Sequence, residues 1–241
     1  MRLPKAILFD LDDTILTEGE RPVILLTVAE EMAEALAPFG AIEVADRLEA
    51  ALRAFWAGTP AAETARLRTS RFGLSQVRQA VITQALTTLG VAGMPAIAVR
   101  FADRFAEIRA QNAELFPGAR ETIETLKAAG VRLALVTNGA ADIQRAKIDR
   151  FSLAGLFEHI QIEGEHGFGK PEAVAYRHAM RALGAPARDT WMVGDNLEWE
   201  VAAPQRLGIY AIWHDHLGRG LPPASAVRPD RIITRLSELL T

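Results

Sequence analysis

The stretch AILFDLDDTILTEGE, residues 6–20, places three aspartates within four positions directly after an apolar run. The run 6–9 is short and is ended by acidic residues, which is typical of a strand buried on both faces of a parallel sheet. Asp10 and Asp12 are two positions apart, so an extended backbone projects both carboxylates to the same side. Because neighbouring carboxylates repel each other, we expect a bound metal cation to offset the repulsion.

The composition sets the outer limits on fold and function. The chain has 241 residues, 49% hydrophobic and 24% charged, and a formal net charge of −3. These values are typical of a globular protein and provide no basic field for nucleic acid. The chain has no cysteine, which excludes disulfides and thiolate sites and fits a reducing cytoplasm, the expected location. Neither a signal peptide nor an apolar run long enough to span a membrane is expected.

A helical pattern follows the first strand. From residue 22 to about 112, apolar residues recur at spacings of three and four, with no strand pattern between them. The stripes are Leu25, Ala29, Met32, Leu36 and Phe39; Val44, Leu48, Leu52 and Phe55; Leu74, Val77, Val81, Ala85 and Leu89; and Ile97, Phe101, Phe105 and Ile108. The pattern predicts four amphipathic helices, inserted after the first strand.

Strands and helices alternate in the rest of the chain. Strands are predicted at 131–137, 159–163, 190–195 and 208–213, followed by an edge strand and a short helix within 229–240. This alternation indicates a parallel sheet covered by helices on both faces. The predicted fold class is therefore α/β, a Rossmann-like open parallel sheet core with an inserted four-helix domain. Residues 1–16 and 113–241 are expected to form the core, and residues 17–112 the insertion.

Four polar clusters follow or flank these strands. They are Asp10-Leu11-Asp12-Asp13-Thr14, Thr137-Asn138-Gly139, Lys170-Pro171 and Gly194-Asp195-Asn196. Ligands of open α/β sheets bind at the carboxyl ends of the strands, so we expect the four clusters to meet at that edge. Asp10, Asp12 and Asp195 together would form the oxygen-rich pocket that suits Mg²⁺.

The remaining polar groups at this edge suit a phosphate. Lys170 adds a positive charge, and Pro171 is expected to begin a helix whose amino end points towards the site. Thr137 offers a hydroxyl, and Asn138 and Gly139 offer backbone N–H groups in a turn, which bind anions. A metal, a lysine and such a cradle together predict a phosphoryl-transfer site.

The clusters DLDDT, TNG, KP and GDN resemble, in order and spacing, the four motifs of the haloacid dehalogenase-like (HAD) hydrolase superfamily. The resemblance covers nearly the whole chain and is closest to the capped phosphatase branch. It implies the HAD fold and identifies the helical insertion as a C1-type cap. It also implies Mg²⁺ as the cofactor, held by a carboxylate oxygen of Asp10, the backbone carbonyl of Asp12, and Asp195.

The same resemblance implies the catalytic roles. Asp10 would be the nucleophile that forms an aspartyl-phosphate. Asp12 would protonate the leaving alcohol and then take a proton from the attacking water. Thr137 and Asn138 would hold the phosphoryl oxygens, and Lys170 would steady Asp10 and the transferring group.

Some residues depart from the family pattern or lie outside it. The fourth motif often has a second aspartate where GDNLEWE has Glu200, which we expect to contact metal-bound water or Lys170. Asp13 is assigned no chemical step. In the insertion, the basic stretch RLRTSRFG, residues 66–73, makes Arg71, and less strongly Arg68, a candidate for substrate specificity. We expect the HDH segment at 214–216, and also His166, to lie in solvated loops.

Asp12 decides between two reactions of the superfamily. A halide leaves without a proton, whereas an alkoxide leaving a phosphate ester needs one. The predicted function is therefore Mg²⁺-dependent hydrolysis of a small phosphorylated metabolite, with no nucleic acid or membrane as partner. A phosphomutase of the same superfamily and a non-catalytic phosphate-ligand binding protein stay open as alternatives. The substrate and the oligomeric state are left open as well.

Overall fold

The computed structural model describes residues 3–56, 74–91 and 94–241. It divides into two compact units. Met1–Thr17 and Glu114–Thr241 form the first, which we call the α/β unit, and Glu18–Ala113 form the second, the helical unit. That these units act as a catalytic core and a cap stays a prediction.

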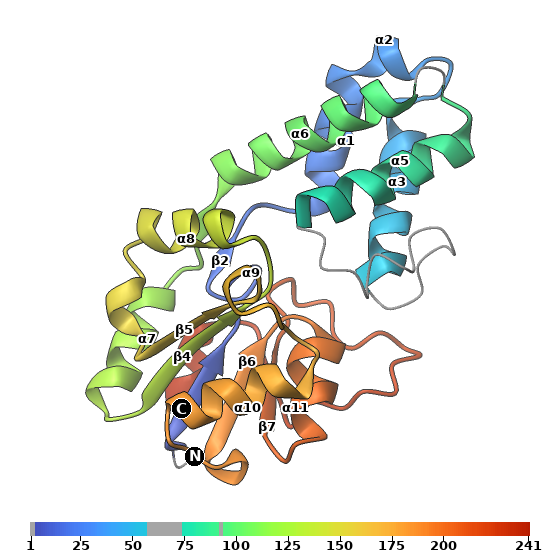
Figure 1. Ribbon diagram of the computed structural model, residues 1–241. Helices are drawn as coiled ribbons and strands as arrows, with labels where there is room; N and C mark the ends of the chain where they lie inside the picture. The colour runs from blue at the N-terminus through green and yellow to red at the C-terminus, as the bar shows by residue number, and fades with distance from the viewer. Residues whose placement is uncertain (1–2, 57–73, 92–93) are drawn as a thin grey trace. The chain divides into compact units, whose positions relative to one another are not determined.

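The α/β unit is built on a six-stranded sheet in which every neighbouring pair is parallel (Figure 1). The strands are β1 (Ala6–Phe9), β4 (Arg132–Thr137), β5 (His159–Ile162), β6 (Thr190–Gly194), β7 (Tyr210–His214) and β8 (Arg231–Ile233). Their order is β5-β4-β1-β6-β7-β8. The predicted α/β fold class is confirmed. The chain winds outward from β1 in both directions, so the topological switch point lies between β1 and β6, where such sheets bind ligands.

Both faces of the sheet are covered, because the side chains of the central strand alternate between two apolar clusters. Ile7 and Phe9 pack in the cluster that contains residues of α7 (Ala119–Ala128) and α8 (Ala141–Arg150). Ala6 and Leu8 pack in the cluster that contains residues of α10 (Ala173–Ala182) and α11 (Ala203–Gln205). All four residues of β1 are fully buried, as its unbroken apolar sequence predicts.

A short antiparallel ribbon marks the places where the chain leaves and re-enters the α/β unit. It consists of β2 (Leu16–Thr17) and β3 (Glu114–Leu115), which pair residue by residue. The sequence pattern does not predict this ribbon, because two-residue strands are too short to show a period of two.

The helical unit has an apolar core of its own. Its described helices are α1 (Arg21–Glu31), α2 (Ala33–Leu36), α3 (Ala41–Trp56), α5 (Leu74–Leu89) and α6 (Met94–Asn112). The prediction of one helix through Phe39 is wrong, since α1 ends at Glu31 and α2 at Leu36. Ala37 is extended (φ −54°, ψ 143°), as the residue before a proline usually is, so Pro38 ends α2. Arg71 and Arg68 lie outside the described residues.

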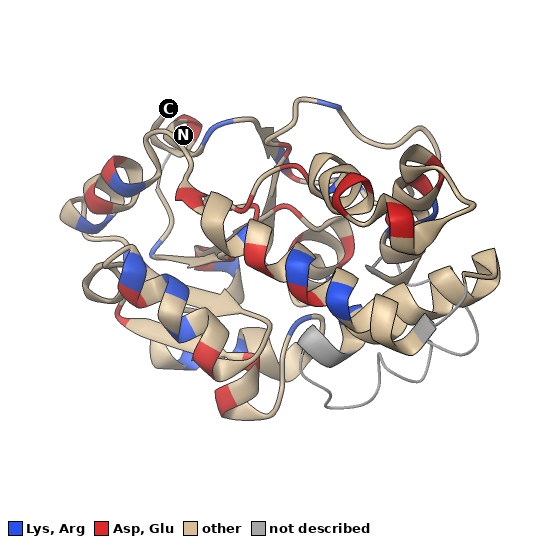
Figure 2. Cartoon of the chain, turned by 90° about the horizontal axis from the view of Figure 1, so that it is seen from above, with Lys and Arg blue, Asp and Glu red and all other residues tan. Residues whose placement is uncertain are grey.

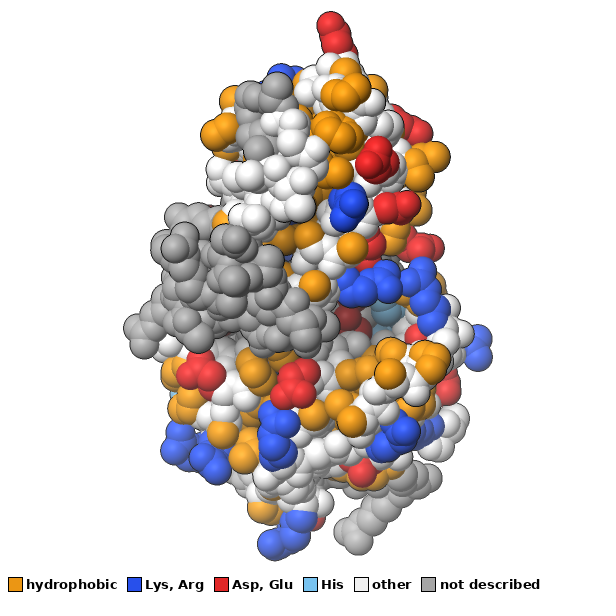
Figure 3. Space-filling view, turned by 90° about the vertical axis from the view of Figure 1, so that its right-hand side faces the viewer, with side chains coloured by type: hydrophobic (Ala, Val, Ile, Leu, Met, Phe, Trp, Pro, Cys, Tyr) orange, Lys and Arg blue, Asp and Glu red, His pale blue; other side chains and the backbone are white. Residues whose placement is uncertain are grey.

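Acidic and basic side chains are mixed on the surface. Several helices carry both kinds (Figure 2), and on the face drawn in Figure 3 both kinds lie among hydrophobic side chains. Among the described residues that these views draw, this mixture agrees with the small formal net charge. Among the described helices, none combines the length and the apolar character that crossing a membrane requires.

Candidate active site

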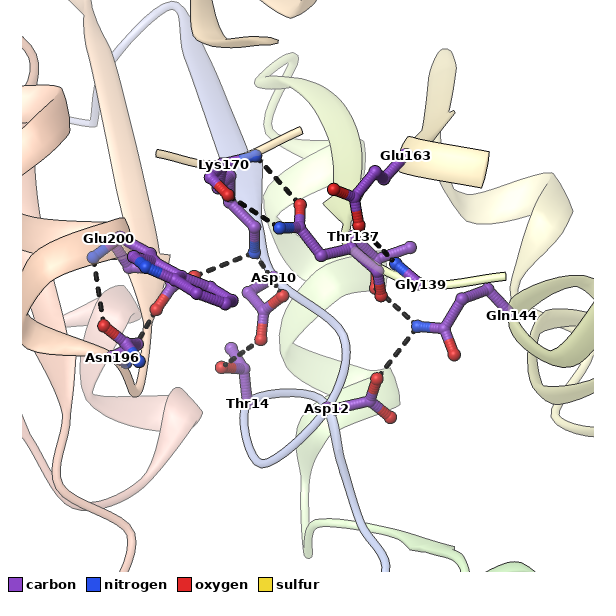
Figure 4. Close-up of polar contacts among 12 residues, drawn as sticks. Asp10, Asp12, Thr14, Thr137, Gly139, Gln144, Glu163, Lys170, Asn196 and Glu200 are labelled. Atoms are coloured by element: carbon purple, nitrogen blue, oxygen red, sulfur yellow. Dashed lines mark hydrogen bonds and ion pairs between the residues drawn. The ribbon is translucent and has the colours of Figure 1, made fainter. Parts of the chain in front are cut away.

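Asp10 is the first residue after β1 and is buried, with 6% of its surface exposed. Its backbone N–H donates to Val193 O of β6 at 3.0 Å, which fixes the start of the loop at the switch point. One carboxylate oxygen, Oδ1, accepts from Lys170 Nζ at 2.5 Å, and the other, Oδ2, accepts from Thr14 Oγ1 at 3.2 Å (Figure 4). Burial raises the pKa of Asp10, Lys170 lowers it, and Asp12 raises it again.

Lys170 is bound by two carboxylates. Besides Asp10, it contacts Glu200, with 2.8 Å between Lys170 Nζ and Glu200 Oε1, and both side chains are buried (Figure 4). Burial alone would lower the pKa of Lys170, but the two carboxylates raise it above its usual value, so the ammonium stays charged. Burial raises the pKa of Glu200 to about 7 against the opposing effect of Lys170. Of the two partners expected for Glu200, metal-bound water or Lys170, the structure shows the contact with Lys170.

Asn196 shapes the turn that delivers Glu200. Asn196 Oδ1 accepts from the backbone N–H groups of Glu198 and Trp199, both at 3.0 Å, and so caps η4, the π-helix Leu197–Ala202. The backbone N–H of Asn196 donates to Glu200 Oε2 at 2.6 Å. Single π-helical turns are frequent at functional sites. Here the turn directs Glu200 back towards Lys170.

Gly194 leaves room for Glu200. A Cβ atom built on Gly194 would lie 2.0 Å from Cγ and 2.5 Å from Cβ of Glu200. Real Cβ atoms do not approach other atoms so closely, so any larger residue at this position would displace Glu200 from Lys170.

We predict that Gly194→Ala lowers the free energy of unfolding by about 1–3 kcal/mol, the usual cost of overpacking. Gly155→Ala is the matched control, because a Cβ there meets nothing within 4 Å. The control should change stability by no more than about 0.5 kcal/mol. Urea denaturation of both variants measures the difference, and equal midpoints would contradict the crowding described for Gly194.

Asp195 brings a further carboxylate to the same place. It follows β6, and its backbone oxygen accepts from Trp213 Nε1 at 2.6 Å. Burial raises the pKa of Asp195 well above its usual value, and the charges of Glu200, Asp13 and Asp10 raise it further. Three carboxylates, those of Asp10, Asp195 and Glu200, therefore share the charge of one lysine. Such a surplus of hard oxygen ligands fits a divalent cation such as Mg²⁺.

The loop after β4 holds the backbone of Lys170. Asn138 Nδ2 donates to Lys170 O at 2.7 Å, and Asn138 Oδ1 accepts from Lys170 N at 2.9 Å. The N–H of Gly139 donates to Glu163 Oε2 at 3.1 Å (Figure 4). The expected helix start at Pro171 is wrong, because α10 begins at Ala173. Lys170 is positioned by Asn138 rather than by a helix beginning next to it.

Asp12 faces α8. Its two carboxylate oxygens accept from Lys147 Nζ at 2.7 Å and from Gln144 Nε2 at 2.8 Å. Gln144 Nε2 also donates to Thr137 Oγ1 at 2.6 Å (Figure 4). The buried Gln144 therefore joins the second aspartate of the first motif to the hydroxyl of the second motif.

The sequence predicts no role for four residues of this site. Gln144 and Lys147 are three positions apart on α8 and so share a helix face. Polar pairs at this spacing are common on helices that have no functional site, so the spacing alone does not identify them. Glu163 directly follows the end of β5, where ligand groups of such sheets gather. Thr14 lies inside the first motif but has no distinctive spacing.

Two expectations about histidines are wrong. His166 does not lie in a solvated loop but ends the short helix Glu163–His166 and is partly buried. His214 does not lie in a solvated loop but ends β7 and is 1% exposed. Burial lowers its pKa to about 4, and the charge of His216 lowers it in addition. His214 is therefore a neutral core residue, packed edge-on against Phe116.

The chain is similar to known proteins in sequence and in fold. A family model described as haloacid dehalogenase-like hydrolase matches residues 4–208. The chain is 33% identical over 255 residues to a phosphoserine phosphatase from Thermus thermophilus, with 98% of this chain and 97% of the relative covered. A HAD-hydrolase from Bacillus subtilis, YfnB, whose structure contains magnesium, superposes with a TM-score of 0.72 at 20% identity, covering 99% and 97% of the two chains. An L-2-haloacid dehalogenase, RSc1362, superposes with a TM-score of 0.70 at 19% identity, covering 99% and 98%.

Proposed function

Because the chain belongs to the haloacid dehalogenase-like hydrolase family, we propose that it hydrolyses a small phosphorylated metabolite with Mg²⁺ through an aspartyl-phosphate on Asp10. The chain is a phosphoric monoester hydrolase, the class of two relatives that match 98% and 99% of its length. The proposal that Asp10 is the nucleophile rests on the buried contact of Asp10 Oδ1 with Lys170 Nζ at 2.5 Å. A carboxylate held this way is a recognised nucleophile for phosphoryl transfer.

In the proposed first step, a carboxylate oxygen of Asp10 attacks phosphorus and the ester oxygen leaves. Asp12 gives that oxygen a proton, so that an alcohol departs rather than an alkoxide. Lys170 offsets the charge of Asp10 and of the transferring group. Asp10, the backbone carbonyl of Asp12, and Asp195 would hold Mg²⁺, which when bound neutralises charge on the phosphoryl oxygens.

In the proposed second step, Asp12 takes a proton from water, and that water attacks phosphorus. The bond between phosphorus and the Asp10 oxygen breaks, inorganic phosphate leaves, and the Asp10 carboxylate is restored. The contacts of Asp12 with Lys147 and Gln144 support this role, since they hold both of its oxygens in place. Efficient acid–base help needs such positioning.

The phosphate contacts are assigned by position. Thr137 would contribute its hydroxyl and Lys170 its ammonium. The side chain of Asn138 is bound to the backbone of Lys170, so a contact from Asn138 to phosphate would come from its backbone N–H. Oriented backbone N–H groups at such turns bind anions well.

The competing functions are separated by what is produced. A dehalogenase shares the fold, but it has no use for the proton that Asp12 supplies. A phosphomutase would convert a sugar phosphate into its isomer and release little phosphate. A non-catalytic binding protein would release none. Measuring inorganic phosphate and isomerised product in the same reaction separates the three cases.

Metal removal gives a direct prediction. Turnover of 4-nitrophenyl phosphate should fall to background in EDTA and return when Mg²⁺ is added in excess, because the surplus carboxylate charge would otherwise repel the phosphate. Ca²⁺ should restore far less activity, since it prefers larger and more flexible oxygen shells. Undiminished turnover in EDTA would contradict the proposed metal requirement.

A phosphate-release screen over a metabolite panel tests the substrate class. The panel should include phosphoserine and phosphoglycolate, because relatives carry those names, together with sugar phosphates and nucleotides. The Asp10→Ala variant serves as the blank for every compound. The proposed function predicts phosphate release from at least one small monoester by the wild type only, and equal release by the variant would overturn it.

A further inference from the structure

A second cluster of potential metal ligands lies in the α/β unit, away from the carboxylates. His159 begins β5, His166 ends the short helix α9 (Glu163–His166), and His178 lies on α10. One ring nitrogen of each lies within 4.8 Å of those of the other two. Both α9 and α10 pack against β5, which is an edge strand of the sheet (Figure 1). We call this group the histidine cluster.

The hydrogen bonds of two rings leave a nitrogen lone pair available. His166 Nδ1 lies 3.1 Å from Ile162 O, and a carbonyl oxygen can only accept, so this nitrogen carries the proton of the neutral ring. His178 Nδ1 lies 2.9 Å from Gln161 Oε1, an amide oxygen that also accepts. In the neutral form of each ring, Nε2 is then unprotonated. A metal-binding histidine typically donates its other ring N–H to a carbonyl or carboxylate in this way.

The third ring has an unpartnered nitrogen. His159 Nε2 is buried and has no hydrogen-bond partner among the residues that the structure describes. Buried polar atoms without a partner are rare and costly, which points to a group that completes the site. Burial and the nearby charges of His178 and His166 lower the pKa of His159, and burial and the charge of His166 lower that of His178. Both lowered pKa values favour the neutral ring, the form that binds metals.

We propose that the histidine cluster binds a borderline transition-metal ion such as Zn²⁺ through one nitrogen of each ring. Neutral imidazoles suit Zn²⁺, Co²⁺ and Ni²⁺, whereas Mg²⁺ prefers oxygen ligands. Zn–N bonds of about 2.0–2.1 Å place tetrahedral ligand nitrogens about 3.4 Å apart, so small rotations of the rings close the site. The rings are only partly buried, which gives the ion an entry path and leaves a fourth position for water.

The cluster is distinct from the carboxylate site. His159 pairs in register with Ala134 of β4, three residues before Thr137, so it lies back from the carboxyl edge. An ion here would join β5, α9 and α10, and the segment 167–172 that connects α9 to α10 carries Lys170. We therefore expect the ion to stabilise the fold around Lys170 without taking part in the chemistry.

The test uses tag-free protein that has been stripped of metal and returned to excess Mg²⁺, which fills the carboxylate site if the proposed function holds. Co²⁺ is added as a spectroscopic probe, and Zn²⁺ as its competitor. The wild type should take up one equivalent of Co²⁺ with the visible absorption of tetrahedral nitrogen ligation, and Zn²⁺ should abolish the band. Zn²⁺ should also raise the melting temperature, as any ligand specific for the folded state does.

Two variants assign the site. His178→Phe keeps an aromatic ring against Phe168 but removes a ligand, so the cobalt band and the thermal shift should disappear. His216→Phe is the matched control, because it changes a histidine outside the cluster, and it should keep both. Turnover with Mg²⁺ alone reports whether each variant is folded, and His166→Phe replaces His178→Phe if that variant is not. An unchanged cobalt band in the histidine-cluster variant, or no cobalt band in the wild type, would overturn the proposal. The three histidines would then be packed aromatic rings with no metal site.

Discussion

Asp10→Asn and Asp10→Ala should reduce turnover of every phosphate ester to background, a loss on the order of 10⁴-fold or more, as when other covalent nucleophiles are removed. Asn is nearly isosteric with Asp but has no anionic oxygen to attack phosphorus. The fold should survive, because Lys170 keeps its contact with Glu200. Steady-state rates with 4-nitrophenyl phosphate and with the best metabolite from the screen measure the loss.

Two controls make this result specific. Ala accompanies Asn because an asparagine can deamidate slowly to aspartate and restore some activity. Asp13→Asn removes an equal charge from the same loop, and asparagine tolerates the left-handed conformation found at Asp13 (φ 57°). Asp13→Asn should lose far less activity than either Asp10 variant. If Asp10→Ala kept turnover similar to that of Asp13→Asn, Asp10 would not be the nucleophile.

Asp12→Asn should have an effect that depends on the leaving group. For an alkyl phosphate, loss of the acid should lower kcat/KM by about 10²–10⁴-fold. For 4-nitrophenyl phosphate the first step should be much less affected, because nitrophenolate leaves without a proton. The second step still lacks its base, so a burst of nitrophenolate should precede a slow steady state in stopped-flow absorbance.

The comparison of substrates is also the internal control. Misfolding or lost metal binding would slow both substrates alike, whereas loss of the acid slows the alkyl phosphate selectively. Equal reductions in the first step for both substrates would contradict the role assigned to Asp12. Lys147→Met removes one of the two hydrogen-bond donors to Asp12. It should also lower kcat/KM more for the alkyl phosphate than for 4-nitrophenyl phosphate, but by a smaller factor than Asp12→Asn.

The sheet and the ends of its strands could be predicted because their signals are local. Apolar runs such as 6–9 and 133–136 end in polar residues, and the residue that follows each run determines which side chain lies at the carboxyl edge of the sheet. The contact between Asp10 and Lys170 joins residues 160 positions apart, yet it follows from topology once both are placed at that edge. The extra break between α1 and α2 was not visible, since the apolar stripe continues through it.

The contacts that hold the site together could not be predicted in the same way. The clamp of Asn138 on Lys170 and the link from Gln144 to Asp12 depend on side-chain directions, which periodicity does not give. The histidine cluster draws its three members from one strand and two helices, at spacings that match no metal-binding motif. A recurrent motif can place a residue at an edge of the sheet, but packing decides which neighbour it contacts.

The central claim is that Asp10 receives the phosphoryl group while Asp12 handles the protons. It is tested most directly by mixing the Asp12→Asn variant with ³²P-labelled 4-nitrophenyl phosphate and Mg²⁺, quenching with acid within the burst, and locating the label by peptide mapping. The account predicts nearly one labelled phosphoryl group per chain, on the carboxylate of Asp10. A burst of nitrophenolate with no labelled protein, or with the label on another residue, would contradict it.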